Sequence, residues 1–178
     1  IPYFAQYLPG QRLLLLVDRG AGRLTLRIVQ AGVANGGVLA QLDDVGEARF
    51  DRASGQVHLV RTTGPGLWRS GLELREPLLV DREQPTAYWL RRWAVLGGRP
   101  FALRTAAPAC LARWYWLGEA TRAASVCLDP ARRGVPSLPP VVSHDGKWLY
   151  ASMLTGQENS DIGLLELDAM AEAGTTTP

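Results

Sequence analysis

Long hydrophobic runs are absent from this 178-residue sequence. A membrane-spanning helix needs roughly 18 or more apolar residues in succession, whereas the longest apolar run, Leu13 to Val17, ends at Asp18. We therefore expect no membrane span in this segment. A short apolar run bounded by turn residues instead predicts a central strand with both faces covered. The sequence also lacks a signal peptide and begins at Ile1 without a methionine, so we expect a part of a longer protein.

Lysine is nearly absent, because Lys147 is the only lysine among 19 basic residues. The formal net charge is +2 at pH 7, and the basic residues form no continuous stripe. Weak, unclustered positive charge does not predict nucleic-acid binding by this segment. Arginine favours planar contacts with carboxylates, but a composition rich in arginine, alanine and leucine is also typical of a GC-rich bacterial genome. The arginine content therefore assigns no function.

Histidine and cysteine are scarce, with two residues of each. Their positions do not give the ligand spacing of a zinc site, and no glycine-rich phosphate loop precedes a helix. His58 lies in an alternating apolar pattern, which favours a packed strand histidine over a metal ligand. Asp43, Asp44 and Glu47 are expected to form a solvated loop cluster and not a calcium site. We therefore predict no catalytic residue, no cofactor and no metal.

The sequence does contain a strand and turn pattern near its C-terminus. Residues 139–150 indicate an apolar strand, an Asp145-Gly146 turn that admits positive φ, and a second apolar strand. A loop and a third, alternating strand follow at residues 159–168. Together these segments predict a small antiparallel sheet.

The same pattern recurs upstream. Turn glycines at positions 10, 55, 98 and 146 are 45, 43 and 48 residues apart, and a short β-like segment follows each of them 12 to 16 residues later. A period of about 40–50 residues with about four strands per unit is typical of β-propeller blades. We therefore predict an all-β fold in which residues 1–178 form one β-propeller segment of about four blades, each with three to four antiparallel strands.

The blades are expected at residues 3–42, 43–80, 81–128 and 135–168, followed by a frayed tail at residues 169–178. An all-β sandwich whose strand spacing happens to look periodic is the alternative.

One stretch of the sequence resembles a known family. It consists of Ser143-His144-Asp145-Gly146-Lys147-Trp148-Leu149-Tyr150, followed by Ser160-Asp161-Ile162. This pattern is similar to a blade of TolB-like, WD-repeat-like propellers, which also form the C-terminal region of CadC-like winged-helix transcriptional regulators. The resemblance implies structural roles within the blade for five residues, which are Ser143, Asp145, Gly146, Trp148 and Asp161.

The resemblance also implies a function. It suggests a non-catalytic sensory or protein-interaction domain in the periplasmic part of a bacterial, membrane-anchored regulator, with a DNA-binding domain upstream. The expected partner is a protein or a small signal molecule, and self-association would be one way to complete a ring of blades. A cytoplasmic location, an accessory propeller of a serine peptidase and a TolB-like envelope scaffold are the alternatives.

Ser143, His144 and Asp145 contain the residue types of a hydrolase triad. Consecutive residues around a turn point to different sides, whereas a triad needs its three groups to converge. The sequence has no G-x-S-x-G elbow. Ser143 and Asp145 are instead expected to bond to the local backbone.

Tryptophan is concentrated in the third expected blade. That blade holds four of the six tryptophans, namely Trp89, Trp93, Trp114 and Trp116. Rigid rings at this density can line a ligand or peptide site, or they can pack in the core, which we favour. Trp114 and Trp116 are two positions apart and are expected on one face of a strand.

Both cysteines lie in the same expected blade. If residues 110–117 and 120–127 pair across a two-residue loop, Cys110 lies opposite Cys127. Directly opposed antiparallel residues have Cβ atoms about 4.5–5.5 Å apart, close to what a disulfide needs. The pair is therefore a disulfide candidate, and a bond would fit the oxidising periplasm that the family resemblance implies. Two buried thiols that happen to align are the alternative.

Overall fold

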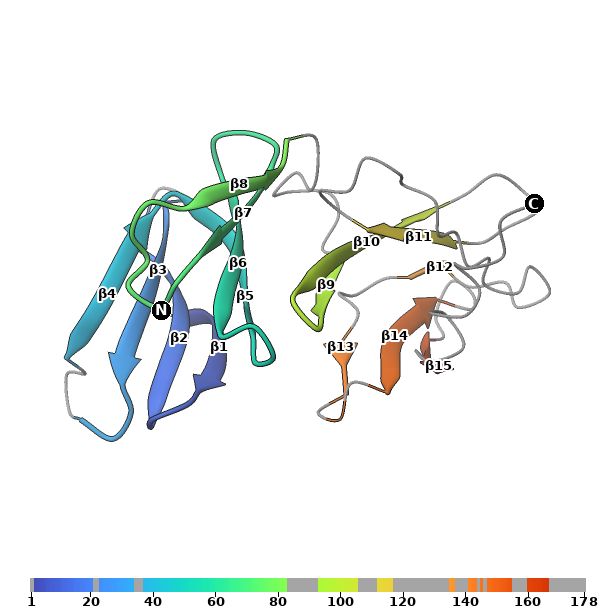
Figure 1. Cartoon of the computed structure of the whole chain (residues 1–178), viewed down its shortest axis with the longest axis horizontal. Helices are drawn as coiled ribbons and strands as arrows, with labels where there is room; N and C mark the ends of the chain where they lie inside the picture. Colours follow the sequence, from blue (N-terminus) through green and yellow to red (C-terminus); the bar gives the residue numbers. More distant parts are fainter. Residues whose placement is uncertain are drawn as a thin grey trace. The chain divides into compact units, whose positions relative to one another are not determined.

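The regular structure in the described part of this chain is β-strand. The computed structural model describes residues 2–20, 23–33, 37–82, 93–105, 112–116, 135–136, 141–143, 145, 147–154 and 160–166. Within these ranges there is no helix, and the strands form four antiparallel sheets (Figure 1). The predicted all-β class is confirmed. Because the described residues include no helix, they contain none that is long and apolar enough to cross a membrane.

The chain divides into two compact units, residues 1–89 and residues 90–178. Unit 1 contains two four-stranded sheets, and in each of them sequence neighbours pair in a simple meander. The strands of the first sheet are β1 (Pro2–Leu8), β2 (Arg12–Asp18), β3 (Leu24–Gln30) and β4 (Val38–Asp43). The strands of the second sheet are β5 (Val45–Asp51), β6 (Gln56–Arg61), β7 (Leu67–Ser70) and β8 (Leu78–Asp81).

Unit 2 contains the other two sheets. The third sheet has three strands in the order β11-β10-β9, which are β9 (Trp93–Leu96), β10 (Arg99–Thr105) and β11 (Ala112–Trp116). In the fourth sheet β14 (Trp148–Leu154) pairs with β15 (Ser160–Glu166) along one side. Two short strands, β12 (Val135–Pro136) and β13 (Val141–Val142), pair with different parts of its other side. A proline in β12 fits this edge position, because proline has no N–H to donate to a ladder.

The turn glycines found in the sequence adopt the backbone conformation that such turns need. The φ angles are +73° at Gly10, +69° at Gly55 and +83° at Gly98, in the left-handed region that glycine enters without steric cost. Gly146, the fourth glycine of the pattern, lies outside the described residues.

The core of unit 1 lies between its two sheets. Leu14 and Leu16 of β2 are at most 2% exposed and belong to the same buried cluster as Phe50 and Leu59 of the second sheet. The prediction that the run Leu13–Val17 is covered on both faces is wrong. Leu13, Leu15 and Val17 are only half-buried, because alternate residues of a strand point to opposite faces and only one face of β2 meets the second sheet.

The side chain of Gln6 joins the two sheets of unit 1. Its Nε2 donates to the Phe50 carbonyl at 3.0 Å, and its Oε1 accepts the Phe50 N–H at 2.8 Å. A side-chain amide thus binds a backbone N–H and C=O as a neighbouring strand would. This contact links residues 44 positions apart and fixes the first sheet against β5.

Gly66, just before β7, gives a direct test of the packing between β7 and β8. Its φ is +131°, and an added Cβ would lie 3.2 Å from the Asp81 backbone oxygen and 3.2 Å from Leu79 Cδ1. We expect Gly66→Ala to lower the free energy of unfolding by roughly 1–3 kcal/mol, measured by chemical denaturation. Gly64→Ala is the matched control, because a Cβ there would meet nothing within 4 Å. Equal losses in the two variants would contradict this account.

Candidate functional site

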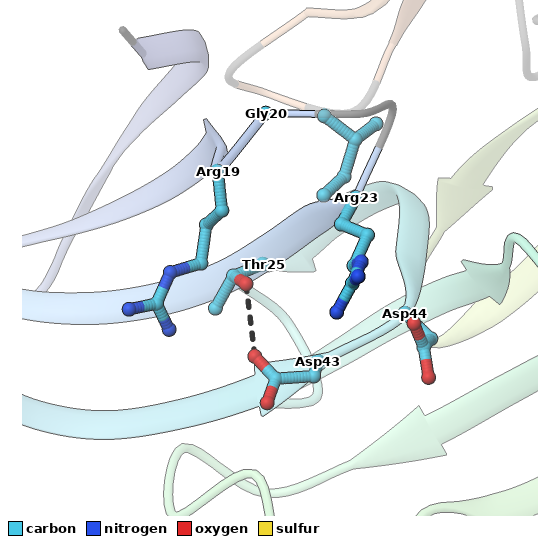
Figure 2. A pocket seen from close by; sticks show the side chains of 7 residues that line it. Arg19, Gly20, Arg23, Thr25, Asp43 and Asp44 are labelled. Atoms are coloured by element: carbon cyan, nitrogen blue, oxygen red, sulfur yellow. Dashed lines mark hydrogen bonds between the residues drawn. The ribbon is translucent and has the colours of Figure 1, made fainter.

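A pocket of about 710 Å³ lies at one end of the first sheet (Figure 2). It is lined by the β2–β3 turn, the start of β3 and the link from β4 to β5, namely Arg19, Gly20, Arg23, Leu24, Thr25, Asp43 and Asp44. Antiparallel pairing creates this neighbourhood, because Thr25 of β3 lies directly opposite Asp43 of β4. The sheet register therefore brings two arginines and two aspartates around one cavity.

The β2–β3 turn holds the two arginines in place. The Arg19 N–H donates to the Arg23 carbonyl at 2.9 Å, and the Arg23 N–H donates to the Gly20 carbonyl at 3.2 Å. The Asp18 carboxylate supports the turn by accepting the Gly20 N–H at 2.7 Å. Figure 2 shows both arginine side chains extending from this turn toward the side of the pocket that carries the two aspartates.

The aspartates are positioned by bonds to neighbouring strands. Asp43 Oδ1 accepts the hydroxyl of buried Thr25 at 2.8 Å, drawn as a dashed line in Figure 2, and the Gln41 amide at 3.3 Å. Asp44 has a φ of +60°, which aspartate tolerates better than most residues. Its carbonyl accepts the Thr62 N–H at 2.9 Å. The link from β4 to β5 is therefore tied to the end of β6.

The charges of the pocket are not paired with one another. Arg19 and Arg23 are exposed, and within the described part of the chain neither guanidinium forms a hydrogen bond or an ion pair. Other arginines of unit 1 do bind neighbouring oxygens, as Arg12 does with Pro9, Arg27 with Gln41 and Arg61 with Asp43. Two cations and two carboxylates thus line one cavity, an arrangement that can bind charged groups of a ligand.

Two of the residues singled out by the family resemblance form a turn of local hydrogen bonds. Ser143 Oγ donates to Asp145 Oδ1 at 2.5 Å and accepts the Trp148 N–H at 2.9 Å. Asp145 Oδ1 also accepts the Lys147 N–H at 3.1 Å. The Ser143 hydroxyl, followed by this backbone N–H, lowers the pKa of Asp145 below its ordinary value. The turn therefore binds its own backbone, as the sequence analysis predicted for Ser143 and Asp145.

The other residues of the resemblance and the tryptophans are described in part. Asp161 lies in β15, where its backbone pairs with Met153. Trp93 of β9 is fully buried, as core packing requires. Trp114 and Trp116 lie in β11, where their backbones pair with those of Leu103 and Phe101 of β10. Some residues singled out in the sequence analysis lie outside the described residues, namely Trp89, Cys110, Cys127, His144 and Gly146.

Sequence reasoning found part of the pocket but not the pocket itself. From the sequence, Asp43, Asp44 and Glu47 were expected to form a solvated acidic cluster. Among the described residues, no group of three or more potential ligands could hold a metal ion. Sequence reasoning did not place Arg19 and Arg23 beside the aspartates, because they are about 20 positions away in the sequence. The register between β3 and β4 could have revealed them, because it pairs Thr25, two residues after Arg23, with Asp43.

The sequence matches no known protein-family model and no curated protein. The function of the chain therefore has to be inferred from its own residues.

Proposed function

We propose that this chain is a non-catalytic sensory domain that binds a small signal molecule in the pocket at the end of its first sheet. The observation that supports this is the set of charged side chains that line the cavity, Arg19, Arg23, Asp43 and Asp44, and the lack of a bonding partner for the two guanidinium groups within the described part of the chain. Charges left without partners around a cavity are available to a ligand.

We also propose that the four sheets are consecutive blades of a TolB-like β-propeller. Four successive antiparallel sheets of three or four strands support this proposal, as does the blade-like motif at residues 143–150 and 160–162. By the same resemblance, we propose that the domain is the periplasmic, signal-receiving part of a bacterial membrane-anchored transcriptional regulator.

Thermal unfolding of the 178-residue chain in the presence of small molecules tests the binding function. The panel contains anionic, cationic, zwitterionic and neutral compounds, and a compound that binds the folded state raises the unfolding midpoint. We expect such a shift to be lost in Arg23→Gln and in Asp44→Asn. Asparagine tolerates the left-handed conformation of residue 44, so the second variant should remain folded.

Arg52→Gln is the matched control, because Arg52 is exposed in the β5–β6 turn and does not line the pocket. It should keep the full shift. The proposed function is wrong if no compound raises the midpoint, or if the shift persists in both pocket variants. Chemical conversion of the bound compound, detected by mass spectrometry, would overturn the non-catalytic assignment.

A further inference from the structure

The charges of the pocket define the class of ligand that it can accept. Two guanidinium groups lie on one side and two carboxylates on the other, so the lining residues have no net charge. A dianion would bring one of its charges toward the aspartates, and a dication would bring one toward the arginines. A like-charge contact of this kind costs free energy. Only a molecule with one charge of each sign satisfies both sides.

The arginine side is suited to a carboxylate. Guanidinium groups bind carboxylates through two parallel N–H···O bonds. Neither Arg19 nor Arg23 uses its guanidinium elsewhere in the described part of the chain. Their backbones are held by the β2–β3 turn, so a carboxylate would order only the side chains.

The aspartate side is suited to an ammonium group. Both bonds that Asp43 receives, from Thr25 and Gln41, go to Oδ1, which leaves Oδ2 for another donor. The Asp44 carboxylate is exposed and lies beside the pocket. An ammonium group carries three donors, so it can donate to a carboxylate oxygen of either aspartate.

We propose that the pocket binds a small zwitterion that carries a carboxylate and an ammonium group, such as a free neutral amino acid or a short peptide. This inference rests on the proposed function and specifies its ligand. The volume of about 710 Å³ lies within the range of small-molecule sites, roughly 300–1,000 Å³. Leu24 also lines the cavity and provides an apolar surface for a hydrocarbon side chain.

Leucine and two of its derivatives test this proposal by calorimetric titration of the 178-residue chain. N-acetyl-leucine keeps the carboxylate but has no ammonium group, and leucinamide keeps the ammonium group but has no carboxylate. We expect leucine to bind and each derivative to bind about tenfold or more weakly. Leucyl-leucine, which separates the two charges, shows whether a peptide or a free amino acid fits better.

Substitutions on the two kinds of charged residue should each weaken a different one of these preferences. Arg23→Gln should reduce the preference for leucine over leucinamide, and Asp44→Asn should reduce the preference over N-acetyl-leucine. Arg52→Gln should leave both preferences unchanged. If a derivative binds as well as the zwitterions, the ligand class is wrong.

Failure of the ligand class can be distinguished from failure of the proposed function. If neither leucine nor leucyl-leucine binds, while another compound of the panel binds in a manner that Arg23→Gln and Asp44→Asn abolish, only the ligand class is overturned. If no compound binds in a manner that depends on these two residues, both proposals fail.

Discussion

Leu59→Ala is expected to lower the free energy of unfolding by about 2–5 kcal/mol. Leu59 lies in β6, is fully buried, and belongs to the cluster in which the two sheets of unit 1 pack together. Truncation removes apolar contacts and leaves a cavity that the surrounding strands cannot fill, because β6 is paired on both sides by β5 and β7. Chemical denaturation of the variant and of the unmodified chain measures the loss.

Leu39→Ala is the control for this prediction. It makes the same chemical change in β4, where Leu39 is 57% exposed, so we expect a change within about 0.5 kcal/mol. Similar losses in the two variants would show that the two sheets of unit 1 do not share a buried core in solution.

The stability of the folded chain is expected to fall by about 3 kcal/mol as the pH is lowered through the titration range of His58. This side chain is 1% exposed, and neither of its ring nitrogens has a hydrogen-bond partner. Burial lowers the pKa of His58 from its ordinary 6.5 to about 4, and Asp51 opposes this effect only in part. Between pH 6.5 and 4 the unfolded chain therefore binds a proton that the folded chain does not bind.

This difference sets the direction of the pH dependence. The contribution of His58 to the free energy of unfolding is fully present above pH 6.5, decreases as the pH falls toward 4, and is lost below pH 4. Its size follows from the pKa difference, because each pKa unit corresponds to about 1.4 kcal/mol. Denaturation curves recorded between pH 8 and pH 4 measure the effect. Carboxylates also titrate in this range, so the test compares two chains.

His58→Leu is the comparison that isolates this histidine. Leucine cannot be protonated, and its introduction removes no hydrogen bond because the imidazole makes none. We expect the pH dependence of the variant to be smaller by about the amount assigned to His58. Identical pH dependence in the two chains would show that His58 is not buried in its neutral form.

The sequence predicted local structure well where a residue type restricts its own backbone. Gly10, Gly55 and Gly98 were predicted to form turns, and all three have positive φ, because only glycine adopts this conformation without a steric cost. The alternating pattern at residues 159–168 predicted a strand, and β15 (Ser160–Glu166) lies there, because side chains of a strand point alternately to its two faces. These features depend on residues close together in the chain, so periodicity and turn chemistry were sufficient to identify them.

Burial on each face of a strand was not predictable in the same way. The run Leu13–Val17 is apolar throughout, yet only Leu14 and Leu16 are buried in the core. Which face is covered depends on the second sheet, whose position is fixed in part by the bonds between Gln6 and Phe50. No pattern within β2 carries that information.

The candidate site also combines features that the sequence predicts with features that only the tertiary structure shows. By itself, the sequence determined an all-β chain of repeated short strands and turns, because backbone restrictions and side-chain alternation act over a few residues. Only the tertiary structure decided that Arg19, Arg23, Asp43 and Asp44 line one pocket. That arrangement depends on the register between β3 and β4, and a register is fixed by contacts between residues distant in the chain.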